Sequence, residues 1–326
     1  MKALVYDGVE TLNYREMPEP VPAMGEHLIR IAAVGICGSD MHAYLGHDER
    51  RPAPLILGHE AAGIIEAGDQ KGRRVTVNPL VTCGECQYCL AGRDNLCPSR
   101  QIISMQPREG AFAQFVSMPE RNLVTVPENV SLEKAALAEP LAVSWHAARL
   151  ALEALHSSMD RTAIVIGGGA IGLAAALSLQ AMGIHEVTIV EPNEHRRELL
   201  ATKCAQAVTA QASGTASLVI DAVGYSATRA VASELVSPGG VIAHVGLGDN
   251  SGGLDVRRVT LQEITFVGTY TYTAQDFRDT CSALFNGNLG SLDWFEVRSL
   301  EEGAAAFADI RSGNAAAPKI ILNPWP

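Results

Sequence analysis

Short apolar runs, separated by glycine and proline, fill the first 130 residues of the chain. Examples of these runs are HLIRIAAVGIC (27–37), RRVTVNPLV (73–81) and FAQFVSM (112–118), and the region as a whole is rich in β-branched residues. Residues of this kind favour strands, and the glycines and prolines between them favour turns. The pattern predicts an irregular, mostly β domain.

The pattern becomes helical at residue 131, where Ser131 can cap the segment that follows. A break at Pro140 predicts two successive helices, the second of which connects to the next part of the chain. From residue 162, short apolar runs alternate with helical segments: AIVIG, EVTIVE, ASLVIDAVG, GGVIAHVGL and EITFVGTYTY. This βαβ alternation predicts an α/β fold with a doubly wound parallel sheet.

A chain of 326 residues has room for two domains. Its tail returns to helix and loop and ends in PKIILNPWP, whose apolar run can go back to the first domain. We therefore predict a discontinuous β-rich domain of residues 1–145 and 271–326, and a dinucleotide-binding domain of residues 146–270.

The net charge of −11 and the pI near 5.3 argue against a nucleic-acid or anionic-membrane surface. Scattered basic pairs such as Arg50-Arg51 and Arg196-Arg197 are interpreted as solvated surface. The apolar stretch 162–184 fits a buried strand and helix better than a membrane span, because it contains a glycine triplet. Without an apolar signal segment at the N-terminus, the chain is expected in the reducing cytoplasm.

Four of the seven cysteines lie within fifteen residues, with the spacing C-x2-C-x2-C-x7-C. Chance clustering is the first alternative, and disulfides are a second, disfavoured in a reducing compartment. An iron–sulfur site is a third, but the bacterial ferredoxin pattern has three residues, not seven, before its last cysteine. The spacing favours a closed, structural zinc site made of Cys83, Cys86, Cys89 and Cys97.

A glycine motif, Gly167-x-Gly169-x-x-Gly172, follows the apolar run of residues 163–166 and opens a helix. Such glycines allow a tight turn, close approach of a pyrophosphate and close helix packing. Glu191 ends the next strand, where a carboxylate can bind ribose hydroxyls and repel a 2′-phosphate. NAD is favoured over NADP, although Arg196 and Arg197 leave that choice open. The remaining expected cofactor-binding residues are Ile171, Val223 and Gly224.

Cys37, in GICGSD, and His59-Glu60, in LGHEAAG, are a second set of possible metal ligands. Alone, His59 could equally be a core histidine and Cys37 a small buried hydrophobe. The order GICGSD, GHE, four-cysteine lobe, EPLAV and GGGAIG, however, resembles the zinc-dependent medium-chain dehydrogenase/reductase family over nearly the whole chain. The likeness is closest to the polyol (sorbitol-like) dehydrogenase branch.

The resemblance implies a GroES-like catalytic domain, a Rossmann domain and two zinc ions per chain. Cys37, His59 and Glu60 would bind the catalytic zinc, and Glu139 would be a carboxylate near it that either exchanges with Glu60 or holds the zinc-bound water. Ser39 would accept the substrate proton, with His42 as a possible relay to solvent. Asp40 would hydrogen-bond the ligand histidine and so fix its tautomer.

The expected activity is NAD-linked oxidation of a secondary alcohol on a polyol or sugar-derived substrate, a small molecule. The alternatives are a threonine-type or simple-alcohol dehydrogenase, or a non-catalytic NAD-binding relative. Thr271-Tyr272 stands where related enzymes carry an Arg-Tyr pair, so sorbitol itself is in doubt. The family also implies a homo-oligomer, dimer or tetramer, joined through strands near GGVIAHVGL and EITFVGTYTY.

Overall fold

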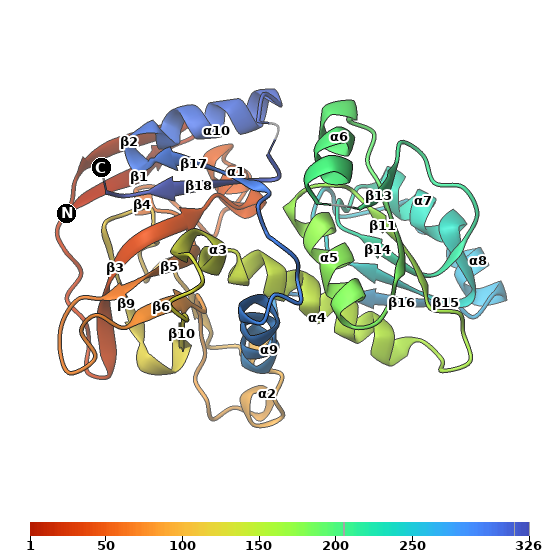
Figure 1. The fold of residues 1–326 in the computed structure, drawn as a ribbon, viewed down its shortest axis with the longest axis horizontal. Helices are drawn as coiled ribbons and strands as arrows, with labels where there is room; N and C mark the ends of the chain where they lie inside the picture. Colours follow the sequence, from red (N-terminus) through yellow and green to blue (C-terminus); the bar gives the residue numbers. More distant parts are fainter. Residues whose placement is uncertain (205, 316, 326) are drawn as a thin grey trace. The chain divides into compact units, whose positions relative to one another are not determined.

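The structure is a computed structural model that describes residues 1–204, 206–315 and 317–325. The chain divides into two compact units. Figure 1 shows the last part of the chain, in blue, returning to the elements of the N-terminal part, in red and orange. The first unit comprises Met1–Glu139, Thr273–Phe285 and Phe295–Pro326, and the second comprises Pro140–Tyr272 and Asn286–Trp294.

The division differs in detail from the predicted domains. The first boundary lies at Glu139, inside the connecting helix, rather than after residue 145. Residues 286–294, expected in the β-rich domain, group with the second unit.

The first unit is built around a seven-stranded sheet. Its order is β10 (Leu123–Thr125), β6 (Arg74–Val77), β5 (Glu60–Ile65), β3 (Glu26–Gly35), β18 (Lys319–Asn323) and β17 (Phe295–Ser299), with β9 (Phe115–Pro119) paired to β3. Two smaller sheets are β2 (Thr11–Glu16), β1 (Lys2–Gly8) and β4 (Leu55–Ile56), and β7 (Leu80–Val81) with β8 (Gln101–Ile102).

Short helices surround these sheets. They are α1 (Gly38–Tyr44), α2 (Gln87–Leu90), α3 (Leu132–Ala136), α9 (Ala274–Phe285), α10 (Gly303–Ser312) and the 3-10 turns η1 (Asp94–Leu96), η2 (Glu120–Asn122) and η3 (Leu300–Glu302). Ser131 caps α3 as expected, since its hydroxyl accepts a hydrogen bond from the Lys134 N–H. The core of the unit includes Phe112 and Phe307, whose rings meet edge to face.

The last strand of the chain lies inside the seven-stranded sheet rather than at its edge. β18 is antiparallel to β3, with Leu322 opposite Val34, and parallel to β17, with Ile321 opposite Val297. This confirms that the terminal apolar run rejoins the β-rich part of the chain, because its backbone groups pair with strands on both sides.

The second unit holds a six-stranded sheet in which every neighbouring pair is parallel. Its order is β13 (Ala207–Thr209), β12 (Glu186–Val190), β11 (Thr162–Ile166), β14 (Ala216–Asp221), β15 (Val236–His244) and β16 (Thr265–Gly268). Figure 1 shows α5 (Ala170–Ala181) and α6 (Glu194–Lys203) on one face, and α7 (Ser226–Leu235) and α8 (Val256–Leu261) on the other. The α/β fold class with a doubly wound sheet is confirmed.

The long helix α4 (Ala138–Ala154) begins at the boundary and continues into the second unit. None of the helices in the described ranges is long and apolar enough to cross a membrane.

The position of β18 generates a stability prediction. Leu322 is fully buried, so Leu322→Ala leaves a cavity and should destabilise the first unit by about 2–5 kcal/mol. Val297→Ala, on the neighbouring strand at a side chain that is 47% exposed, should change stability by less than about 0.5 kcal/mol. Calorimetry, which can separate the transitions of the two units, measures both effects. Equal effects of the two substitutions would contradict the interior placement of this strand.

Candidate functional site

Cys37 and His59 are brought together by the carboxylate of Asp40. Cys37 follows β3 and is the N-cap residue of α1. Asp40, in the first turn of this helix, accepts hydrogen bonds from the Cys37 N–H at 3.0 Å and the Gly58 N–H at 3.2 Å. Burial raises the pKa of Asp40, but the charge and hydrogen bond of His59, the charge of Arg51 and the hydrogen bond from the Cys37 N–H outweigh it and lower the pKa overall. Asp40 is therefore an anion that joins the cysteine segment to the histidine segment.

The two nitrogens of the buried His59 ring have different surroundings. Nδ1 lies 3.2 Å from the Ser104 hydroxyl and 3.4 Å from Oδ1 of Asp40. Nε2 lies 3.4 Å from the Ser39 hydroxyl. Burial lowers the pKa of His59, but the charges and hydrogen bonds of Asp40 and Cys37 raise it well above its ordinary value. Metal-binding histidines usually have hydrogen-bond acceptors around the ring nitrogen that does not bind the metal, as Nδ1 of His59 has in Ser104 and Asp40.

Glu60, next to His59, forms a buried ion pair that the sequence did not predict. Its Oε1 accepts a hydrogen bond from Nζ of Lys319 at 2.6 Å, and the same ammonium donates to the Ile36 carbonyl at 2.9 Å. Burial lowers the pKa of Lys319, but the carboxylate of Glu60 and the thiolate of Cys37 raise it more. The other oxygen of the carboxylate, Oε2, is buried without a hydrogen-bond partner.

The donor set fits a zinc ion chemically: a thiolate from Cys37, an imidazole from His59 and the unpaired carboxylate oxygen of Glu60. The three side chains are not, however, gathered as closely as the ligands of a closed site. Among the described residues, the four clustered cysteines are the only group of three or more whose ligand atoms all lie within 4.8 Å of one another. Metal binding by Cys37, His59 and Glu60 stays a prediction.

The other expected residues of this site have mixed positions. Glu139 is buried in the first turn of α4, and its charge acts on Lys319. His42 is exposed in α1, with its ring 6.4 Å from that of His47. Tyr272, of the Thr271-Tyr272 pair, is fully buried.

The sequence analysis missed Lys319, Ser104 and Arg51. Arg51 was interpreted as solvated surface, and this was wrong, because its side chain is only 2% exposed. One signal was available for Lys319: it is a single charge at the start of an apolar run, and a buried charge needs a partner.

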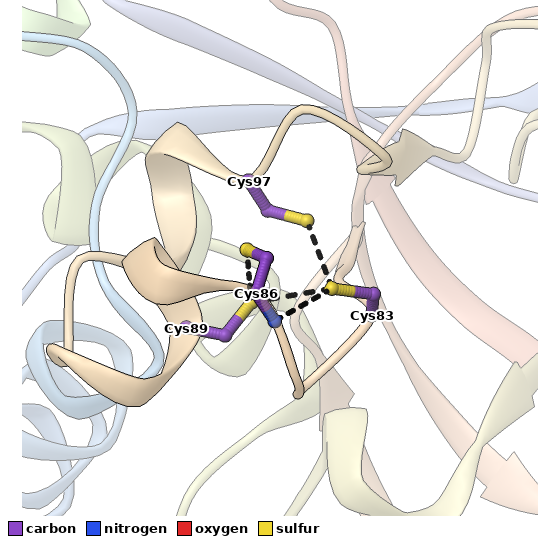
Figure 2. A group of neighbouring side chains, drawn as sticks. All are labelled: Cys83, Cys86, Cys89 and Cys97. Atoms are coloured by element: carbon purple, nitrogen blue, oxygen red, sulfur yellow. Dashed lines mark hydrogen bonds between the residues drawn. The ribbon is translucent and has the colours of Figure 1, made fainter.

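The four-cysteine lobe lies between β7 and β8 of the first unit. Figure 2 shows the four side chains turned toward one another. The Cys83 sulfur lies 3.5 Å from the Cys97 sulfur and 3.8 Å from the Cys89 sulfur. The Cys89 and Cys86 sulfurs are 3.5 Å apart. A zinc tetrahedron with Zn–S bonds of about 2.3 Å has S–S edges of about 3.8 Å. The lobe can therefore hold one metal ion in a closed shell.

Two local features prepare the lobe. Hydrogen bonds from the backbone N–H groups of Glu85 and Cys86 lower the pKa of Cys83 to about 6, which favours the thiolate form that binds metals. Asp94, within the lobe, accepts hydrogen bonds from the Ala274 N–H at 3.1 and 3.2 Å. The contact between Asp94 and Ala274 anchors the lobe to the start of α9.

The glycine motif forms the predicted turn between β11 and α5. Gly167 has φ +96°, and a Cβ there would lie 2.5 Å from the Val223 side chain. A Cβ on Gly172 would lie 1.8 Å from the Gly167 carbonyl oxygen. Gly169 is the N-cap residue of α5. The turn therefore requires glycine, and it leaves the first N–H groups of a twelve-residue helix available to a phosphate.

Glu191 lies beside this turn in a fixed orientation. Its Oε2 accepts a hydrogen bond from the Gly168 N–H at 2.9 Å, and its Oε1 accepts one from the Asn193 N–H at 2.8 Å. Nη1 of Arg196 is 3.4 Å from Oε2. A hollow of about 600 Å³ opens here, lined by Glu191, Pro192, Arg196, Val223 and Thr228 among others.

Asp221, at the end of β14, holds the backbone around Val223, which also lines the hollow. Its Oδ1 accepts hydrogen bonds from the N–H groups of Val223 at 3.0 Å and Gly224 at 2.9 Å. Burial raises the pKa of Asp221, but the His244 side chain and the hydrogen bonds from Gly224, Val223 and Thr228 lower it overall. Of the expected cofactor residues, Ile171 lies in α5, where its carbonyl accepts a hydrogen bond from Ser144.

A β-rich unit with thiolate and imidazole donors and a parallel-sheet unit with a nucleotide turn together define the class of zinc-containing, nucleotide-dependent dehydrogenases. Comparison with known proteins agrees. Residues 23–128 match the family described as "Alcohol dehydrogenase GroES-like domain", and residues 170–286 match "Zinc-binding dehydrogenase".

Individual relatives cover most of the chain. A sorbitol dehydrogenase from Arabidopsis thaliana is 32% identical over 81% of this chain and 79% of its own length. An L-galactonate-5-dehydrogenase from Escherichia coli strain K12 is 31% identical over 89% of this chain and 88% of its own. The structure of galactitol-1-phosphate dehydrogenase from Escherichia coli superposes with a TM-score of 0.87 at 25% identity, covering 99% of this chain and 100% of that one. The chain belongs to the zinc-dependent medium-chain dehydrogenase/reductase family, in its polyol dehydrogenase branch.

Removing one thiolate from the lobe should remove its metal. Cys97→Ser should lower the zinc content relative to the unmodified protein and lower the melting temperature, because a structural zinc site contributes directly to folding. Cys204→Ser, outside the cluster, should leave zinc content unchanged. Elemental analysis of the dialysed proteins checks both. Full zinc content in the Cys97→Ser protein would show that the lobe does not bind the metal.

Proposed function

We propose that this enzyme oxidises a secondary alcohol group of a polyol or sugar-derived substrate and transfers a hydride to NAD. The polyol and sugar-acid substrates in the names of its relatives support this substrate class. The observation that carries the proposal is the asymmetric environment of His59, whose Nδ1 is held by buried acceptors while its Nε2 faces the Ser39 hydroxyl.

In this proposal Cys37, His59 and Glu60 hold the catalytic zinc, and the four-cysteine lobe holds a second, structural zinc. When bound, the catalytic zinc would act as a Lewis acid that lowers the pKa of a substrate hydroxyl. The Ser39 hydroxyl, 3.4 Å from Nε2 of His59, would accept the proton that the substrate releases. His42, exposed in the same helix, would pass that proton to solvent.

Charge balance supports the same assignment. The carboxylates of Glu60 and Glu139 and the thiolate of Cys37 all act on the buried Lys319. In the proposed metal-bound state, the Cys37 thiolate and the two carboxylates would carry more negative charge than the one ammonium balances, and a divalent cation would offset the excess. Glu139 would then contribute a second carboxylate near the metal without being an obligatory ligand.

The nucleotide site favours NAD over NADP in this proposal. The Glu191 carboxylate is held by two backbone N–H groups at the hollow next to the glycine turn, where it can accept hydrogen bonds from ribose hydroxyls. The same charge would repel a 2′-phosphate.

We also infer a homo-oligomer in the cytoplasm. The parallel sheet ends at β16, an edge strand whose backbone groups can pair with a second copy. The thiolates of the four-cysteine lobe require a reducing compartment.

The substrate class can be tested by NADH formation against a panel of polyols, sugar acids, hydroxy amino acids and simple secondary alcohols. We expect the highest kcat/KM among the polyols and sugar acids. Cys37→Ala should lose one zinc per chain and at least a hundredfold in kcat/KM. Losing even a residue that only hydrogen-bonds a metal ligand lowers metal affinity or activity by about 10–100-fold. Cys204→Ala is the matched control. A preference for threonine or a simple alcohol would contradict the proposed polyol and sugar-acid substrates. Turnover that survives Cys37→Ala would refute the assignment of Cys37 as a ligand of the catalytic zinc.

Cofactor choice has its own test. Glu191→Ser removes the negative charge beside the glycine turn, so the ratio of kcat/KM for NAD to that for NADP should fall by about tenfold or more, equivalent to about 1.4 kcal/mol. Glu194→Gln, in the first turn of α6, changes an exposed charge near Glu191 in the sequence and serves as control. Steady-state kinetics with both cofactors measures the ratio. An unchanged ratio in the Glu191→Ser enzyme would remove Glu191 from cofactor selection.

A further inference from the structure

Arg51 is a buried arginine that donates three hydrogen bonds, two of them to residues that contact His59. Its Nη1 donates to the Ser39 carbonyl at 3.1 Å and to Oδ2 of Asp48 at 2.8 Å. Its Nε donates to the Ser104 carbonyl at 3.0 Å. The neighbouring Arg50 also pairs with Asp48, but its side chain is 60% exposed.

Ser39 and Ser104, whose carbonyls Arg51 binds, are the two residues whose hydroxyls contact His59. The Ser39 hydroxyl faces Nε2 and the Ser104 hydroxyl faces Nδ1, so the imidazole lies between them. The two serines are 65 positions apart, one in α1 and the other in the turn after β8. The guanidinium of Arg51 is therefore a direct bridge between the segments on either side of the ring.

The backbone at Ser104 needs such support. Its φ is +71°, in the left-handed region that residues with a side chain rarely occupy. A conformation of this kind persists where the surrounding structure holds it, and the hydrogen bond from Nε of Arg51 to the Ser104 carbonyl provides one restraint.

The geometry requires an arginine. A guanidinium is planar and carries its donors in fixed directions, so one side chain can bind two carbonyls and a carboxylate at once. A lysine ammonium is a single point on a flexible stem and cannot reproduce that spacing.

We infer that Arg51 is a positioning residue for the catalytic metal ligand. It fixes the hydroxyls of Ser39 and Ser104 against the two ring nitrogens, and thereby sets the orientation in which His59 presents Nε2. This inference rests on the proposed zinc site, and it adds a specific residue that controls the geometry of that site. Arg51 acts through the two serines and touches neither substrate nor metal.

Cobalt substitution tests the inference, because the visible spectrum of Co²⁺ reports ligand geometry independently of turnover. The difference between the cobalt spectra of each protein and of its Cys37→Ala counterpart isolates the site from the four-cysteine lobe. We expect Arg51→Gln and Arg51→Lys to change this difference spectrum and to speed metal release to a chelator by about 10–100-fold. Arg50→Gln, which removes the exposed partner of the same Asp48, should leave both unchanged.

The outcomes separate the two levels of the proposal. If the unmodified protein shows no Cys37-dependent cobalt spectrum, the proposed zinc site itself fails. If that spectrum is present and is the same in the Arg51 variants, with the same rate of metal release, Arg51 has no positioning role. Should the Arg51 variants fail to fold, Ser104→Ala decides the question, because it removes only the hydroxyl against Nδ1. An unaltered spectrum and release rate in Ser104→Ala would overturn the inference.

Discussion

The ion pair between Lys319 and Glu60 is the contact on which the architecture of the first unit depends. The two residues are 259 positions apart, and both side chains are nearly or fully buried, with exposures of 4% and 0%. Two isolated charges could not remain in such an environment, because removing one partner leaves the other buried and uncompensated. The pair therefore requires that the C-terminal strand return beside the segment that carries His59.

The register of the strands explains why the ligand candidates meet at one end of the sheet. Gly35, the last residue of β3, lies opposite Glu60 in β5 and opposite Ile321 in β18. A Cβ on Gly35 would lie 2.0 Å from Oε2 of Glu60, so glycine leaves room for the carboxylate. Cys37 follows two residues later and caps α1. The same three strands thus place a thiolate, a carboxylate and an ammonium together.

The sequence predicted features whose physical cause is local. Four cysteines at metal-ligand spacing, and glycines between an apolar run and a helix, are sufficient in themselves to indicate a closed shell and a nucleotide turn. It did not reveal Lys319, Arg51 or Ser104, because their roles arise from contacts between distant segments. A lysine before an apolar run and one of two adjacent arginines carry no sign of the side chains that they meet. The domain boundary at Glu139 was also missed, since the helical pattern continues across it.

The cysteine lobe and the proposed ligand set of Cys37, His59 and Glu60 differ in how fully other protein groups satisfy their donor atoms. The sulfurs of the cysteine lobe lie at distances close to those of a tetrahedral shell, so the protein would supply all four ligands of a bound ion. At the other group, Glu60 has one oxygen bonded to Lys319 and one buried oxygen with no partner. A buried anionic oxygen without a hydrogen bond is unfavourable, and a cation beside it would remove that penalty. Lys319 can therefore hold the carboxylate in place through Oε1 while Oε2 stays available to a metal, which is the arrangement that an open, reactive site requires.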